Sequence, residues 1–102
     1  VAFVDRNLNQ IDGTTEHVMA LEPLADKWTA FGWHVQTVDG HDTAAIRKAI
    51  DTAKAAAGKP SVIICNTIKG KGISFMEGQY QWHSGQITEE QYAQGLRDLE
   101  GR

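Results

Sequence analysis

Two uninterrupted apolar segments place the strongest limit on how this chain can fold. Residues 1–4 and residues 61–66 carry no charged side chain and consist mainly of residues that favour strands. Apolar runs of this kind are typical of strands buried on both faces of a parallel sheet. A third strand is predicted for residues 33–38, and helical patterns separate the three strands. The sequence therefore predicts βαβ passages and a three-layer α/β fold, in which helices flank a parallel sheet.

The helix expected before the strand at residues 33–38 has a signal at each end. Pro23 suits the first helical position, and Gly32 suits the position just past the last turn. Leu24, Trp28 and Phe31 recur at helical spacing between these two residues. The spacing predicts that this face of the helix is buried.

The helix expected after that strand is predicted to begin at Asp42 or Thr43, because both residue types cap helix N-termini. Its apolar positions form a narrow stripe made of Ile46, Ala49, Ile50, Ala53 and Ala57. We interpret residues 14–20 and the glycine-rich residues 69–85 as loops. Residues 88–91 are Thr-Glu-Glu-Gln, which predicts a capping box at the start of a closing helix.

Composition excludes several functional classes. A net charge of −3, with mixed signs and no basic run, gives no basis for nucleic-acid binding. No apolar stretch approaches the roughly 18 residues that a membrane-spanning helix needs, so no membrane association is expected. Cys65 is the single cysteine and lies in an apolar run, which favours a buried side chain in a reducing, cytoplasmic compartment.

The polar turn after the first strand holds candidate metal ligands. Asn7 and Asn9 come just beyond the carboxyl end of the strand, where ligands bind in open α/β sheets. Their side-chain and main-chain oxygens suit a hard cation such as Mg²⁺ or Ca²⁺. The alternative is a turn whose asparagines bond only their own backbone. Gly13 closes the turn and is predicted to adopt a positive φ, and we interpret Asp12 as structural.

This turn and several later motifs resemble the transketolase family. Residues 5–7, Asp-Arg-Asn, and residues 10–13, Gln-Ile-Asp-Gly, are similar to the second half of the thiamine diphosphate motif of that family. Further motifs follow in family order: Leu21-Glu22-Pro23-Leu24-Ala25, Asp39-Gly40-His41-Asp42, Thr67-Ile68-Lys69-Gly70-Lys71-Gly72 and Trp82-His83. The resemblance covers essentially all 102 residues. It implies that residues 1–102 are the C-terminal half of a diphosphate-binding domain, without the upstream Gly-Asp-Gly half.

The resemblance also implies roles for individual residues. Asn7 would bind the metal through its side chain, and Asn9 through its main-chain carbonyl. Ile11 and Lys69 join these two and His83 as expected cofactor-binding residues. His83 is the expected catalytic residue, because an imidazole titrates near neutral pH and suits proton transfer at a substrate hydroxyl. The alternatives are a water-exposed loop histidine at position 83 and a solvated lysine at position 69.

The reaction that the resemblance implies is transfer of a two-carbon ketol unit between sugar phosphates. It would use thiamine diphosphate with Mg²⁺ or Ca²⁺. In this family the cofactor lies between two subunits, so the expected partners are the rest of the domain and a pyrimidine-binding domain or C-terminal subunit. The chain is expected to be the N-terminal subunit of a split transketolase or a piece of a larger one, inactive alone, in a homodimer or heterotetramer.

Two other interpretations remain open from the sequence. One is another thiamine diphosphate enzyme, such as a deoxyxylulose-phosphate synthase or the decarboxylase subunit of a dehydrogenase. The other is a non-catalytic assembly or binding domain that keeps the same scaffold.

Overall fold

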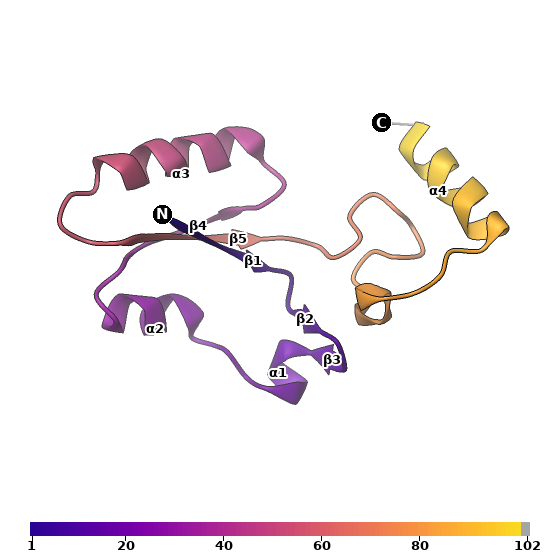
Figure 1. Cartoon of the computed structure of the whole chain (residues 1–102), viewed down its shortest axis with the longest axis horizontal. Coiled ribbons are helices and arrows are strands. Elements are labelled where there is room, and N and C mark those ends of the chain that lie inside the picture. Colours follow the sequence, from indigo (N-terminus) through magenta and orange to yellow (C-terminus); the bar gives the residue numbers. More distant parts are fainter. Residues whose placement is uncertain (101–102) are drawn as a thin grey trace. The chain divides into compact units, whose positions relative to one another are not determined.

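A three-stranded parallel sheet is the central element of the computed structural model, which describes residues 1–100. Strand β5 (Ser61–Asn66) lies in the middle, between β1 (Ala2–Arg6) and β4 (His34–Asp39). Helix α3 (Thr43–Ala55) covers one face of this sheet and helix α2 (Leu24–Ala30) covers the other (Figure 1). The predicted three-layer α/β architecture with a parallel sheet is confirmed.

The register of the sheet brings three strand ends to one edge. Arg6 of β1 and Asp39 of β4 are both paired with Asn66 of β5. Each of these residues is the last of its strand, so all three lie at the carboxyl edge of the sheet. The predicted site residue Asn7 comes directly after Arg6, and Lys69 comes three residues after Asn66. Both segments therefore start at this edge of the sheet.

The core is built around β5. Val62 and Ile63 are fully buried, and Ile64 and Cys65 are nearly so. Helix α3 adds its buried Ala49 and Ala53, whose small side chains let the helix approach the sheet closely. Burial raises the pKa of the Cys65 thiol, with a smaller contribution from the charge of Asp5, so this cysteine is a buried neutral group as its apolar setting predicts.

The prediction that residues 1–4 are buried on both faces is wrong. Within the described chain, β1 is an edge strand that pairs only with β5, and its side chains alternate between half-buried and exposed. Phe3 remains 53% exposed. An apolar run specifies a strand, but the pairing of distant strands decides which one becomes central.

Helix α2 differs from the prediction at its start and in the burial of Phe31. It begins at Leu24, so Pro23 is its N-cap residue and not its first helical residue. It ends at Ala30, which places Phe31 beyond the last turn and leaves that ring 83% exposed. The predicted burial of Phe31 is therefore wrong, whereas the predicted end is confirmed by Gly32, whose φ is +83°. Trp28 is half-buried against Trp33, with ring centroids 4.8 Å apart.

Asp42 is the N-cap of α3, as predicted. One carboxylate oxygen accepts the backbone N–H groups of Ala44 at 2.9 Å and Ala45 at 3.0 Å. These two donors have no partner within the helix, so the carboxylate stabilises its first turn.

Replacing this cap gives the first testable prediction. We expect Asp42→Ala to destabilise the start of α3 by about 1 kcal/mol, the usual cost of losing a helix cap. Hydrogen exchange of the Ala44 and Ala45 amides should then be about fivefold faster, since exchange reports local opening. Asp51→Ala, an exposed carboxylate on the same helix, is the matched control and should leave these rates unchanged. Equal exchange in both variants would contradict the capping role.

The chain folds into two compact units. The first unit comprises residues 1–6 and 20–67, which hold the parallel sheet, α2 and α3. The second unit comprises residues 7–19 and the chain from residue 68 onward. It holds β2 (Asn9–Gln10), β3 (Gly13–Thr14), α1 (Thr15–Val18), the 3-10 helix η1 (Tyr80–His83) and α4 (Glu89–Glu100).

The second unit corrects two predicted loops and confirms one predicted cap. Residues 14–20 contain the short helix α1, and residues 69–85 contain η1. The capping box of α4 is present: the Thr88 hydroxyl accepts the Gln91 N–H at 3.2 Å, and the Gln91 side chain accepts the Thr88 N–H at 3.0 Å. Across residues 1–100, the helices are all too short or too polar to cross a membrane.

Candidate functional site

The five predicted site residues all belong to the second unit. Asn7, Asn9 and Ile11 come from its first segment, and Lys69 and His83 from its second. The two groups are more than 50 positions apart in the sequence, and β2 and β3 pack against η1 within this unit. The unit therefore joins the two segments on which the predicted site depends.

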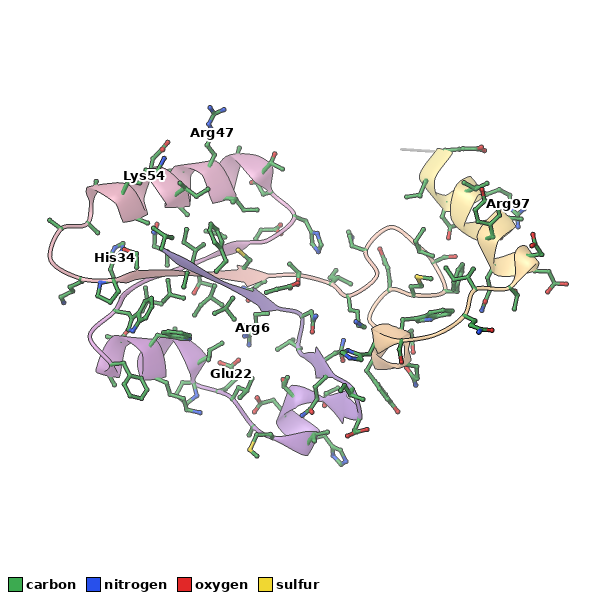
Figure 2. The ribbon with its side chains drawn as sticks, viewed as in Figure 1. Arg6, Glu22, His34, Arg47, Lys54 and Arg97 are labelled. Atoms are coloured by element: carbon green, nitrogen blue, oxygen red, sulfur yellow. The ribbon has the colours of Figure 1, made fainter. Side chains whose placement is uncertain are left out.

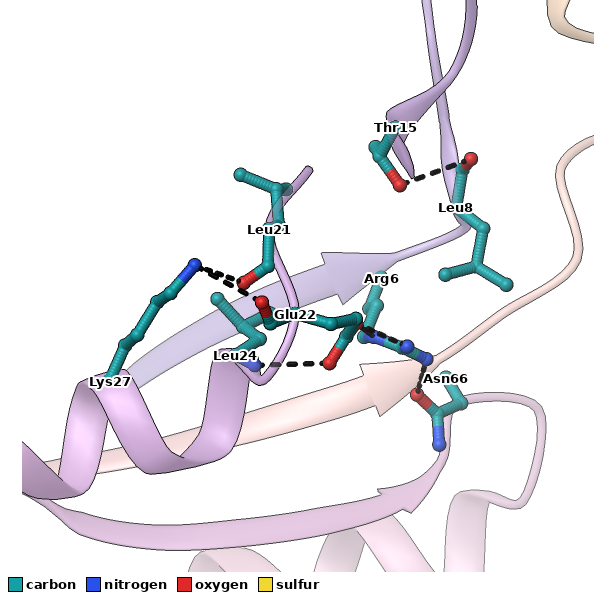
Figure 3. Close-up of polar contacts among 8 residues, drawn as sticks. All are labelled: Arg6, Leu8, Thr15, Leu21, Glu22, Leu24, Lys27 and Asn66. Carbon is teal, nitrogen blue, oxygen red and sulfur yellow. Dashed lines mark hydrogen bonds and ion pairs between the residues drawn. The ribbon is translucent and has the colours of Figure 1, made fainter. Parts of the chain in front are cut away.

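The Asn7 turn is fixed by hydrogen bonds on both sides of Leu8. The Asn7 Oδ1 atom accepts the backbone N–H of Asn9 at 2.9 Å. The Leu8 carbonyl accepts the Thr15 N–H at 2.8 Å. It also accepts the Thr15 hydroxyl at 3.3 Å (Figure 3). The self-bonding turn that the residues suggested is thus present. A carbonyl oxygen has two lone pairs, so this hydrogen bond leaves one lone pair of Asn7 Oδ1 available for a second partner.

Leu8 is a feature that sequence reasoning missed. Its φ is +61°, and it is the one residue other than glycine with a positive φ among residues 1–100. A positive φ is sterically unfavourable for leucine, and strained backbone of this kind clusters at functional sites. No sequence signal identified it, because asparagine or glycine is the residue expected at such a position.

Ile11 and Asp12 form the tip of a hairpin. Asn9 pairs with Thr14 and Gln10 with Gly13 in the antiparallel β2–β3 ladder. The tip is exposed, with Ile11 at 61%.

Gly13 follows the tip and is buried, with a φ of +156°. The predicted positive φ is confirmed. A Cβ atom at this position would come within 3.3 Å of a Val18 methyl group, so a side chain here would also crowd α1.

Lys69 lies at the neck of a compact loop. The Lys69 carbonyl accepts the Gly78 N–H at 2.8 Å, which closes residues 69–78 into a loop. Inside the loop the Glu77 carboxylate accepts the Gly72 N–H at 2.9 Å and lies 3.7 Å from the Lys71 ammonium. Because the loop is shaped by its own contacts, it resembles the compact Ω-loops that often carry function.

A close approach of backbone to side chain tightens this loop. Gly70 has a φ of +68°, and a Cβ atom there would lie 2.6 Å from the Met76 side chain. Only glycine fits this position without a shift of its neighbours. The residue that follows Lys69 is therefore fixed by the loop geometry.

Asn9 links the hairpin to this loop. Its Nδ2 atom donates to the Gly78 carbonyl over 3.5 Å, at the neck where Lys69 is bonded. The 3.5 Å distance makes this a weak hydrogen bond. It nevertheless brings Asn9 and the backbone of Lys69 to the same neck.

His83 is the last residue of η1 and is exposed. The preceding Trp82 holds η1 in place, because its Nε1 atom donates to the Phe75 carbonyl at 3.0 Å. The Trp82 and Phe75 rings also meet edge to face, with centroids 5.4 Å apart. Trp82 therefore anchors the segment and leaves the His83 imidazole accessible to a ligand.

The available donors fit one kind of metal. Among residues 1–100, no group of three histidine, cysteine, aspartate or glutamate side chains could enclose an ion. The Asn7 and Asn9 oxygens are neutral and hard, which suits Mg²⁺ when an anionic ligand such as a diphosphate supplies the remaining oxygens and the charge. The chain thus offers part of a coordination shell.

Comparison with known proteins identifies relatives along the whole described chain. Residues 1–100 match the family model described as "Transketolase, thiamine diphosphate binding domain". The 6-deoxy-6-sulfo-D-fructose transketolase subunit of Clostridium sp. (strain MSTE9) is 54% identical over 100 residues, which are 98% of this chain and 36% of that protein. An apulose-4-phosphate transketolase subunit of Phocaeicola vulgatus is 45% identical over 102 residues, which are 100% of this chain and 36% of that protein. The chain thus spans about a third of the length of these relatives.

Solved structures give the same result for the fold. A transketolase from Leishmania mexicana superposes with a TM-score of 0.83 at 34% identity, covering 98% of this chain and 15% of that one. A transketolase from Campylobacter jejuni superposes with a TM-score of 0.83 at 29% identity, covering 93% of this chain and 15% of that one.

Proposed function

Because this chain belongs to the transketolase thiamine diphosphate-binding domain family, we propose that its parent enzyme transfers a two-carbon ketol unit between sugar phosphates or closely related sugars. The observation that carries the proposal is the family match over residues 1–100, which includes every predicted site residue. The arrangement of Asn7, Asn9, Lys69 and His83 within one compact unit supports it.

The residues of this chain would divide the work of holding the cofactor. The Asn7 side chain and the Asn9 main-chain carbonyl would supply oxygens to a Mg²⁺ ion bound together with the diphosphate, with Ca²⁺ as the other cation suited to such ligands. Lys69 adds a positive charge beside the anion. Ile11, at the hairpin tip, and His83, on η1, are the remaining proposed cofactor contacts. Bound thiamine diphosphate supplies the stabilisation of the substrate carbanion.

His83 would move a proton at the substrate hydroxyl. Its imidazole is accessible on η1, and histidine exchanges protons near neutral pH. Trp82 restrains the neighbouring backbone through its bond to Phe75, which limits the positions that the imidazole can adopt. Such positioning is required for general acid–base catalysis.

The parent enzyme would include a second polypeptide or domain. Two relatives are named as transketolase subunits, and the chain covers 36% of each of them. We propose that this chain is part of the N-terminal subunit of a split transketolase and that the pyrimidine of the cofactor is bound by the partner subunit. Such a split enzyme would assemble as a heterotetramer, whereas a parent enzyme that keeps both domains on one polypeptide would be a homodimer.

A substrate panel tests the proposed reaction. The parent protein with its partner subunit, thiamine diphosphate and Mg²⁺ would be supplied with three ketol donors: xylulose 5-phosphate, apulose 4-phosphate and 6-deoxy-6-sulfofructose. Ribose 5-phosphate would be one of several aldose acceptors. We expect two-carbon transfer from at least one donor, and the preferred donor would distinguish the substrate classes named for the relatives. Cofactor binding without transfer from any of them would contradict the reaction.

The isolated 102-residue chain provides a further expected outcome. Asn7 and Asn9 supply only neutral oxygens, and residues 1–100 lack a cluster of three acidic, histidine or cysteine side chains that could complete a metal shell. We expect no turnover above buffer in the same assay, even with saturating cofactor and Mg²⁺. Clear turnover would contradict the proposal that the site needs the rest of the parent enzyme.

A further inference from the structure

The chain passes between its two units three times. It leaves the first unit after Arg6, returns at Ala20, and leaves again after Thr67. The first passage leads directly to Asn7, and the last leads within two residues to Lys69. Both segments that carry the proposed cofactor-binding residues therefore follow directly from residues of the first unit, Arg6 and Thr67.

Arg6, at the first passage, forms hydrogen bonds with residues next to the second and third passages, and all of these residues belong to the first unit. Arg6 donates from Nε to the Glu22 carboxylate at 2.8 Å, and its Nη2 atom donates to the same oxygen. Its Nη1 atom donates to the Asn66 side-chain oxygen at 2.9 Å (Figure 3). Glu22 lies just after the second passage, and Asn66 lies just before the third. We name Arg6, Glu22 and Asn66 the carboxyl-edge clasp.

Backbone and hydroxyl contacts strengthen the clasp. The Thr67 N–H donates to the Arg6 carbonyl at 3.1 Å, and the Thr67 hydroxyl donates to the Asp5 carboxylate. The other Glu22 oxygen accepts the Leu24 N–H at 3.0 Å, which ties the carboxylate to the start of α2. Each passage is thus fixed to its neighbour by more than one hydrogen bond.

The clasp differs from an ordinary surface ion pair. Isolated exposed pairs contribute little, but a forked arginine bound to two partners fixes geometry as well as charge. The Arg6 side chain is 26% exposed and lies beside a pocket of about 220 Å³ that Thr37 and Ile64 also line. The hydrogen bond from the Leu24 N–H lowers the pKa of Glu22 below its usual range, and the hydrogen bond from Arg6 lowers it further. This carboxylate is therefore ionised at neutral pH.

We propose that Arg6 is a positioning residue for cofactor binding. It acts through its hydrogen bonds to Glu22 and Asn66, which restrain the chain next to the points where the segments that carry Asn7 and Lys69 start or end. The inference rests on the proposed function, because it concerns the same thiamine diphosphate site. In this proposal Arg6 acts without contacting the cofactor, because each of its three nitrogens donates to Glu22 or Asn66.

The test measures cofactor affinity and stability separately in the parent protein with its partner subunit. The variants are Arg6→Met, Glu22→Gln and the double variant. Arg47→Met is the matched control, because it removes the same charge. Arg47 is exposed on α3 and points away from the sheet in Figure 2. Calorimetric titration with thiamine diphosphate at saturating Mg²⁺ gives Kd, and thermal unfolding without cofactor gives Tm.

We expect Arg6→Met to raise Kd about tenfold, the lower end of the cost of removing a residue that orients metal ligands. The Tm of the cofactor-free protein should stay within a few degrees of the wild type. Because both residues act through one contact, the double variant should bind the cofactor no more weakly than Arg6→Met alone. Arg47→Met should change neither quantity.

Several results would overturn the inference. An unchanged Kd in Arg6→Met, or effects of Arg6→Met and Glu22→Gln that simply add, would show that Arg6 does not position the site through Glu22. A large fall in Tm with unchanged Kd would show a purely structural role. If Arg6→Met does not fold, the isosteric Glu22→Gln decides, and its unchanged Kd overturns the inference. A wild-type protein that binds no cofactor would overturn the proposed function together with this inference.

Discussion

His83→Ala in the parent enzyme should lower kcat by about 10²–10⁴-fold, the range typical of a lost general acid or base. The imidazole is accessible on η1, whereas the cofactor's metal would be bound by the Asn7 turn. We therefore expect the loss of His83 to affect the chemical step more than cofactor affinity. If the proton transfer occurs only in the transition state, kcat and kcat/KM should fall together.

The kinetics of this variant separate three possible roles. A residue that only binds substrate would raise KM and preserve kcat. A solvated loop histidine would change neither constant by more than a small factor. His17→Ala is the matched control, because His17 is an exposed histidine of the same unit on α1. If kcat of His83→Ala stays within about threefold, or ~0.65 kcal/mol of barrier, His83 is not the proton-transfer group.

Asn7→Ala should weaken Mg²⁺-dependent binding of thiamine diphosphate by on the order of 100-fold, the upper end of the cost of disturbing residues around a bound metal. Mg²⁺ requires nearly octahedral oxygen ligation, so the loss of one oxygen is poorly compensated. The turn is only half-buried, and the cofactor-free protein should lose about 1 kcal/mol or less. Calorimetric titration at several Mg²⁺ concentrations measures the effect.

The Mg²⁺ series also separates a ligand from a turn residue. Asn7 accepts the Asn9 N–H at 2.9 Å, so alanine removes a turn contact as well as a potential ligand. If Asn7 binds the metal, raising Mg²⁺ should recover part of the lost cofactor affinity. A loss that does not depend on Mg²⁺ would assign Asn7 to the turn alone. Gln10→Ala, an amide of the same hairpin, is the control and should retain wild-type affinity.

Local patterns in the sequence predicted the elements whose stability depends on near neighbours. The bounds of β5 are Ser61 and Asn66, as its apolar run indicated. Asp42 caps α3, and Thr88 and Gln91 form the predicted capping box. Each of these features is marked by residue types that lie within a few positions of one another in the sequence. Such information is complete in the local sequence.

The candidate site was predictable only in part. The family motifs identified Asn7, Asn9, Lys69 and His83, but neither the left-handed Leu8 nor the anchoring of His83's helix through Trp82 and Phe75 had a local signal. Leucine rarely adopts a positive φ, so its conformation is imposed by the hydrogen bonds on either side of it. The roles of the site residues remain predictions that the experiments above test.

The sequence by itself determined the α/β class, the extent of β5, the Asp42 cap of α3, the capping box of α4 and the family of this protein. Only the tertiary structure decided that β1 is an edge strand, that Phe31 is exposed, and that Arg6 joins Glu22 to Asn66. Arg6 and Asn66 are 60 positions apart, and Arg6 and Glu22 are 16 apart. Contacts between such distant residues depend on strand order and register, which no single segment encodes, because each strand forms its hydrogen bonds with another segment of the chain.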